Sequence, residues 1–322
     1  MDRRSFMAGC AGLAWVATEG GALAQSGPLT RIVFPFAAGG GGDMVCRLIA
    51  EHLRPLLDRT VIVENRTGAD GLIGIKSVMS AAPDGATILM TTGPTMYLLP
   101  MVETKPSFDS TKDFVPVSLL SRFEFGIVTG PATDAKDFKQ LVAWLKANPA
   151  KSSFGVPSNG TIPHFTGSRL EEILGIPMTR VPYRGGVPIM KDLIGGHLPF
   201  AVITLAEAIA AHRAGSVRIV AASGATRSPF LPDVPTLKEN GVDLAFDSWY
   251  GLWLPAGSSP DFAKQLSAAV ATVLAKPEVK EKLLAVGLIP VGTTPDDLTK
   301  ELAANTAFWN PIVQATGYKI TN

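Results

Sequence analysis

One segment near the start of the chain constrains the fold more than any other. An apolar run at 32–36 has the pattern of a β-strand and passes through four glycines, 39–42, into an amphipathic helix that begins near Met44. Glycine-rich backbone at a helix N-terminus leaves N–H groups unpaired, and the positive end of the helix dipole points at the same place. Such a turn binds carboxylates or phosphates, with an ordinary flexible turn as the alternative. The sequence therefore predicts an α/β protein with a candidate anion site.

The spacing of these glycines argues against a nucleotide as the anion. A dinucleotide fingerprint needs G-x-G-x-x-G/A, but here the last position is Met44 or Val45, depending on where the motif begins. No Lys-Ser/Thr pair follows, as a P-loop would require. Asp43 stands at the start of the helix, where a carboxylate accepts backbone N–H bonds, so we expect it to order the glycine loop by capping.

The first residues have the organisation of an export signal. Arg3 and Arg4 precede an apolar stretch that ends at Ala17, and an A-x-A cleavage site follows at 22–24. We expect residues 1–24 to be a signal peptide and the mature chain to be periplasmic. The paired arginines resemble a twin-arginine signal, while the Sec route stays open.

Removal of this leader leaves Cys46 as the single cysteine, so no intrachain disulfide is expected. Cys46 shares the apolar side of its helix with Leu48 and Ile49, which predicts a core thiol. The chain has a net charge of +1 and no basic run, which argues against nucleic acid as a partner. The four histidines form no metal-binding motif, and no serine lies in G-x-S-x-G, so no metal, cofactor or hydrolase nucleophile is expected.

Strand-like and helical patterns alternate along the chain, which predicts parallel sheets built from βα units. The strand-like runs lie at 31–36, 60–64, 87–91, 152–156, 178–182, 199–204 and 217–223. Two longer extended runs, 115–129 and 246–255, have the lengths and positions of two crossings of a hinge. We therefore expect one discontinuous lobe, 25–125 and 248–322, and a second lobe, 126–247.

Two further loops repeat the arrangement of a strand followed by a helix. Ser158, Asn159, Gly160 and Thr161 offer backbone, hydroxyl and amide donors before a helix that contains His164. Ordinary helix capping is the alternative role for the two hydroxyls.

In the third loop, Gly185 permits close approach of the backbone to a ligand. Tyr183, two residues earlier, either contacts the ligand or belongs to the core.

Several motifs, in order along the chain, resemble the periplasmic receptors of the tripartite tricarboxylate transporter (TctC) family, also called Bug-type receptors. They are Phe34-Pro35-Phe36-Ala37-Ala38-Gly39-Gly40 with Asp43, the run 63–71, the run 181–186, the run 232–236 and Trp249-Tyr250-Gly251. The resemblance implies a type II periplasmic binding fold, in which two α/β lobes close over a small organic carboxylate that membrane permease subunits then take up. It also implies that the loops at 36–43 and 158–164 hold the carboxylate, partly through water.

The residues expected to bind the ligand come from four places in the chain. They are Phe36, Ala37, Ala38, Gly39, Gly40 and Asp43 in the first loop, Ser158, Asn159, Gly160, Thr161 and His164 in the second, Tyr183 and Gly185 in the third, and Thr204.

Thr204 stands where the resembled family often has Asp, so a partner for a ligand amine is missing there, which argues against amino acids. Met96 and Tyr97 follow the third strand, and lining an apolar pocket or packing in the core remain alternative roles for them.

The sequence as a whole predicts a monomeric, non-enzymatic receptor that delivers a carboxylate to a transporter. Two alternatives remain, namely the same receptor acting on a sensor kinase and, less favoured, a secreted α/β enzyme.

Overall fold

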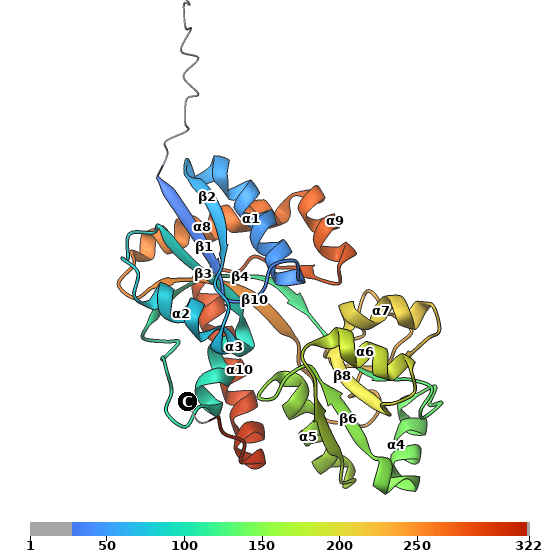
Figure 1. Cartoon of the computed structure of the whole chain (residues 1–322). Helices are drawn as coiled ribbons and strands as arrows, with labels where there is room; N and C mark the ends of the chain where they lie inside the picture. Colours follow the sequence, from blue (N-terminus) through green and yellow to red (C-terminus); the bar gives the residue numbers. More distant parts are fainter. Residues whose placement is uncertain (1–27, 321–322) are drawn as a thin grey trace, which may run out of the picture.

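The structure is a computed structural model that describes residues 28–320, which form two α/β lobes, each built on its own sheet (Figure 1). The expected signal peptide lies outside the described residues. The first sheet has the order β11-β4-β10-β3-β1-β2 and the second the order β7-β6-β8-β5-β9. Among residues 28–320, no helix has both the length and the apolar composition needed to cross a bilayer.

The strands of the first sheet are β1 (Leu29–Phe34), β2 (Thr60–Asn65), β3 (Thr87–Thr92), β4 (Phe114–Phe123), β10 (Ser248–Pro255) and β11 (Ile289–Pro290). Around it lie α1 (Gly41–Leu57), the short turn η1 (Ala69–Gly71), α2 (Leu72–Met79), α3 (Gly93–Val102), α8 (Pro260–Ala275), α9 (Pro277–Ala285) and α10 (Pro295–Thr316).

The strands of the second sheet are β5 (Phe125–Thr129), β6 (Ser153–Val156), β7 (Thr179–Pro182), β8 (Phe200–Thr204) and β9 (Arg218–Ala222). Its helices are α4 (Phe138–Ala147), η2 (Pro149–Lys151), α5 (Ile162–Leu174), α6 (Gly186–Ile194) and α7 (Leu205–Arg213). The strand-like runs found in the sequence therefore correspond to strands, with ends that differ by one or two residues.

The expectation of parallel sheets built from βα units is confirmed in part: β1 pairs in parallel with β2 and β3, and β6 pairs in parallel with β7 and β8. β10 runs antiparallel to both β3 and β4, and β5 runs antiparallel to both β8 and β9. The physical reason is connectivity, because parallel neighbours in one sheet need a crossover, and β5 and β10 each enter their sheet directly from the other lobe. β4 passes into β5 across the single residue Glu124, and the chain returns between β9 and β10 (Figure 1).

The core of the first lobe surrounds β10 and the inner face of α1. Trp249 and Trp253 are fully buried on β10, with ring centroids 5.9 Å apart. Cys46 on α1 is also fully buried, and its Sγ lies 2.9 Å from the Sδ atom of Met90 on β3. The prediction that Cys46 is a core thiol is confirmed, and burial raises its pKa well above the ordinary value.

The C-terminal helix connects the lobes. α10 packs on α3 and β4 of the first lobe and also reaches α5 of the second. After α10, the backbone N–H of Ile320 donates to the carbonyl of Val102 at the end of α3. This contact places the C-terminal segment beside the second lobe, where Tyr318 packs edge-on against the ring of His164.

Candidate functional site

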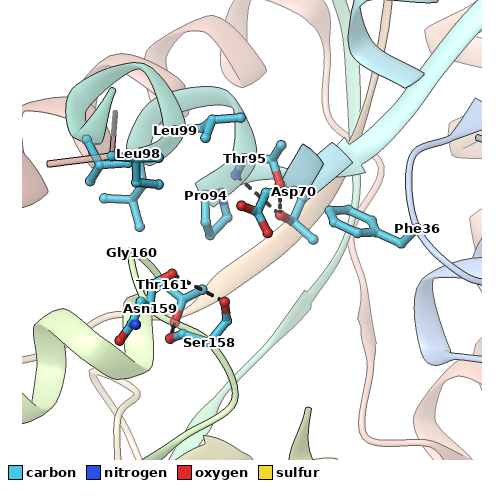
Figure 2. A pocket seen from close by; sticks show the side chains of 13 residues that line it. Phe36, Asp70, Pro94, Thr95, Leu98, Leu99, Ser158, Asn159, Gly160 and Thr161 are labelled. Carbon is cyan, nitrogen blue, oxygen red and sulfur yellow. Dashed lines mark hydrogen bonds between the residues drawn. The ribbon is translucent and has the colours of Figure 1, made fainter. Parts of the chain in front are cut away.

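A cavity of about 240 Å³ lies between the two lobes (Figure 2). The first lobe lines it with Phe36, Asp70, Thr92, Pro94, Thr95, Leu98, Leu99, Val102 and Ile320, and the second lobe lines it with Ser158, Asn159, Gly160 and Thr161. Most of the first-lobe wall is apolar, whereas the second lobe contributes a polar loop. The site therefore combines an apolar body with hydrogen-bonding groups, which is typical of small-molecule sites.

The polar loop connects the end of β6 to the start of α5. Thr161 is the N-cap residue of α5, but its side chain makes no capping hydrogen bond to the helix. Its Oγ1 atom instead donates to the carbonyl of Ser158 over 2.9 Å. The Thr161 hydroxyl therefore does not cap the helix, which was the alternative role considered for it. The positive end of α5 faces the cavity without a side-chain acceptor from its own N-cap.

His164 supports this loop from behind and is not among the residues that line the cavity. Its ring is fully buried, and Nδ1 accepts a hydrogen bond of 3.0 Å from the backbone N–H of Gly160. The guanidinium of Arg180, on β7, contacts the other ring nitrogen. Burial and the charge of Arg180 lower the pKa of His164 to about 4, so the ring is neutral near neutral pH.

The glycine loop after β1 is only partly at the cavity. Phe36 lines it, whereas Ala37, Ala38, Gly39 and Gly40 are exposed and are not among its lining residues. Gly39 and Gly40 border a different surface cavity of about 490 Å³, together with residues of α1 and α9.

Asp43 fixes this loop in its position. The carboxylate, in a residue only 4 % exposed, accepts hydrogen bonds from the backbone N–H of Gly39 and from the side chains of Arg47 and Asn65. Burial opposes ionisation, but these hydrogen bonds outweigh it, and the pKa of Asp43 is lowered. Asn65 also donates to the carbonyl of Phe36 over 3.1 Å, a role that sequence reasoning missed. The signal available was its place at the end of β2, beside the end of β1.

The residues expected in the third loop and after β8 make contacts within the second lobe. The hydroxyl of Tyr183 donates to Asp192 over 2.7 Å, and burial with that carboxylate raises the pKa of Tyr183 to about 12. Gly185 donates its N–H to the carbonyl of Pro157, and Thr204 donates its hydroxyl to Glu207. None of these three lines the cavity between the lobes.

The wall formed by α3 was the main feature that sequence reasoning missed. β3 ends at Thr92, and Gly93-Pro94 begins α3, so the strand–Gly–helix pattern was visible there too. Thr92 caps α3 by accepting the N–H of Thr95. Met96 and Tyr97 are buried at 0 % and 2 % exposure and belong to the core, which decides between the two roles left open for them. Within residues 28–320, no group of three or more His, Cys, Asp and Glu side chains is arranged to hold a metal.

Comparison with known proteins places this architecture in one family. The family model of the tripartite tricarboxylate transporter family receptor, TctC, matches residues 45–318. A UPF0065 protein encoded in the TAR-I ttuE-ttuC' intergenic region of Agrobacterium vitis is 33% identical over 314 residues, covering 95% of this chain and 88% of that protein. BugT of Bordetella pertussis is 29% identical over 293 residues, covering 90% of each chain.

Solved structures agree with this assignment. A periplasmic transporter is 31% identical with a TM-score of 0.80, covering 90% of this chain and 98% of that one. Rpa4515 of R. palustris with adipate is 26% identical with a TM-score of 0.81, covering 91% and 98%. MatC of Rhodopseudomonas palustris with bound malate is 26% identical with a TM-score of 0.77, covering 88% and 98%. These matches confirm the expected type II periplasmic binding fold, and the chain belongs to the TctC family of tripartite tricarboxylate transporter receptors.

Proposed function

We propose that this chain is an exported, monomeric receptor that captures a small organic carboxylate between its lobes and delivers it to the membrane permease subunits of a tripartite transporter. The observation that carries this proposal is the cavity whose walls come from both lobes. A ligand that contacts both walls binds the closed arrangement better than the open one, and that difference in affinity drives closure.

The polar loop of the second lobe supplies the carboxylate site in this proposal. Ser158 and Thr161 add hydroxyl groups to the N–H groups at the start of α5. Charge-assisted hydrogen bonds contribute about 1.5 to 3 kcal/mol each, and micromolar affinity needs about 8 kcal/mol. A few such bonds, together with burial of an apolar body against α3, are sufficient for reversible capture after the cost of ordering and closure.

The hinge in this proposal consists of the two connections between the sheets. The proposed lobes are 25–125 with 248–322, and 126–247. The first connection is the junction of β4 and β5 at Glu124, which lies two residues before the proposed start of the second lobe. Residues 1–24 direct export and are removed, which places the receptor in the periplasm, where family members such as BugD act as binding proteins.

Relatives as well as the cavity support the proposed ligand class. Rpa4515 has adipate and MatC has malate in their solved structures, and both ligands are small carboxylates. The proposal includes capture without chemical change and without a cofactor. Recovery of the ligand unaltered after prolonged incubation is the expected result, whereas product formed at catalytic turnover contradicts the receptor function.

Small-angle scattering with and without ligand tests closure directly. A thermal-shift screen of mono-, di- and tricarboxylates first identifies a ligand, because a compound that binds only the folded chain raises stability by about 2.7 kcal/mol at one hundred times its Kd. We expect the radius of gyration to fall at saturation. An unchanged radius overturns the hinged capture. Delivery is tested by uptake of the same compound in cells with and without the permease genes, and uptake that does not need them contradicts it.

A further inference from the structure

The cavity has one charged side chain among its described lining residues, and that side chain is an acid. Asp70 lies in η1, between β2 and α2, and Figure 2 shows its carboxylate pointing into the cavity on the first-lobe side, with the Ser158–Thr161 loop across from it. A receptor for anions that presents a carboxylate to its own ligand must discriminate among anions by where their charge lies.

The backbone around Asp70 holds it in this position. Gly68, Ala69, Asp70 and Gly71 have positive φ angles of 124°, 46°, 53° and 96° in succession. Left-handed backbone is costly for most side chains, and Asp is among the few that tolerate it. The turn therefore directs a carboxylate into the cavity through a conformation that few other residues adopt.

The two helix N-termini at the cavity differ in what they offer an anion. At α3 the side chain of Thr92 already accepts the N–H of Thr95, and Asp70 lines the same lobe's wall. At α5 the N-cap side chain makes no such bond. A ligand carboxylate is therefore stabilised at the α5 end and repelled at the Asp70 end.

A positive charge behind the α5 end strengthens this polarity. Arg180 contacts His164, which in turn holds Gly160 of the loop. The Nε atom of Arg180 is buried and has no hydrogen-bond partner among the described residues. Its guanidinium also lies over the ring of Tyr318, with Cζ 5.7 Å from the ring centroid. The electrostatic potential across the cavity is therefore positive on the side of Arg180, behind the second-lobe loop, and negative on the side of Asp70, in the first lobe.

From this geometry we infer that the ligand is a monocarboxylate with an apolar body and a hydrogen-bond donor at its far end, and not a di- or tricarboxylate. The inference rests on the proposed function and specifies its ligand. The carboxylate binds the Ser158–Thr161 loop, the body packs against α3 at Leu98 and Leu99, and the donor faces Asp70. Sequence reasoning found no partner for a ligand amine at Thr204, and Asp70 provides one from the other lobe.

Four linear acids with the same carbon chain test this inference by titration calorimetry on the mature protein. They are hexanoate, ω-hydroxyhexanoate, ω-aminohexanoate and adipate. We expect the hydroxy and amino acids to bind more tightly than hexanoate, and adipate to bind about five- to tenfold more weakly than hexanoate because its second carboxylate faces Asp70.

Asp70→Asn isolates the charge, because Asn also tolerates left-handed backbone. This variant should bind adipate about five- to tenfold more tightly than the unmodified chain does, and ω-aminohexanoate more weakly. Asp134→Asn is the matched control, since Asp134 also has a positive φ, of 48°, and is not a lining residue of this cavity. It should leave all four affinities unchanged.

The outcomes separate the two proposals. Adipate as the tightest ligand, or an Asp70→Asn variant with the unmodified order of affinities, overturns the monocarboxylate assignment and leaves the receptor function standing. If the folded protein binds none of the four acids and no member of the wider carboxylate screen, the monocarboxylate assignment and the receptor function are both overturned.

Discussion

The buried ring of His164 holds the backbone of Gly160, through a hydrogen bond of 3.0 Å from the Gly160 N–H to Nδ1. Since Gly160 lines the cavity and His164 does not, the histidine acts on the site through the loop it supports. The bond requires an unprotonated Nδ1, and the lowered pKa of His164, about 4, preserves that state near neutral pH.

Protonation of His164 gives the first prediction, a loss of stability in mild acid. The folded pKa, about 4, lies below the ordinary histidine pKa of 6.5, so between these values the unfolded chain binds a proton that the folded chain does not. The free energy of unfolding should therefore fall as the pH drops through this window, by up to about 3 kcal/mol from this group. The test is urea denaturation of the unmodified chain and of His164→Asn, whose amide oxygen can also accept the Gly160 N–H. The free energy of unfolding should depend less steeply on pH in the variant. Equal slopes would mean that His164 is not the group responsible.

The second prediction concerns Asp43, whose carboxylate binds the Gly39 N–H over 3.0 Å. Asp43→Asn keeps one acceptor for this bond and should cost about 1 kcal/mol, whereas Asp43→Leu keeps none and should cost about 3 kcal/mol. Because the pKa of Asp43 is lowered in the folded chain, the carboxylate stabilises the fold fully above the ordinary aspartate pKa of 3.8, and this stabilisation is lost as the pH falls through the folded pKa.

Chemical denaturation measures both Asp43 variants, with Asp261→Leu as the control. Asp261 is an exposed acid in the first turn of α8, so its loss should change stability by less than about 1 kcal/mol. Ligand affinity should be retained in Asp43→Asn. Similar losses in Asp43→Asn and Asp43→Leu would contradict the role of the carboxylate as an acceptor that orders the loop.

These contacts also explain which parts of the site the sequence could predict. Phe36 and the Ser158–Thr161 loop were recognisable because each follows an apolar strand and precedes a helix, which is the pattern of an anion-binding turn. The rest of the glycine loop was placed at the cavity by the same argument. In the structure Asp43 accepts the N–H of Gly39, and Asn65 donates to the carbonyl of Phe36. Of the residues of this loop, 36–43, Phe36 alone lines the cavity.

Residues brought to the cavity by distant contacts left no local pattern. Ile320 lines it because the C-terminal segment pairs with Glu103, more than two hundred positions earlier in the chain. Asp70 was visible inside a recognised motif, but its direction depends on four successive positive φ angles that residue types alone do not specify. The runs that contain β5 and β10 were recognised as extended, but their antiparallel direction was not predicted, since it is set by passage between the lobes.

The third prediction compares two adjacent glycines in the first turn of α1. A Cβ atom on Gly42 would lie 2.4 Å from Cζ of Phe34 and 2.8 Å from Cε1 of Tyr250, whereas one on Gly41 would meet nothing within 4 Å. Gly42→Ala should therefore destabilise the chain by about 2 kcal/mol through overpacking. Gly41→Ala should be neutral or stabilising by up to about 1 kcal/mol, because alanine is the better helix former. Thermal unfolding of both variants checks this, and equal effects would contradict the packing at Gly42.

The last prediction is that the hydroxyls of Ser158 and Thr161 serve the ligand more than the fold. Removal of the Thr161 hydroxyl loses its bond to the Ser158 carbonyl, which costs about 1 kcal/mol of folding stability. Ser158 donates its hydroxyl to the carbonyl of Asn159, so in the ligand complex each hydroxyl turns its single O–H from a backbone carbonyl to the ligand carboxylate. Each alanine variant should therefore weaken binding about tenfold. Thr204→Ala is the control, because Thr204 donates to Glu207 within the second lobe and does not line the cavity. Titration of the same carboxylate into all three variants measures these affinities. If the loop binds the anion, Thr204→Ala retains affinity while Ser158→Ala and Thr161→Ala lose it. Equal affinities in the three variants would contradict this role of the hydroxyls.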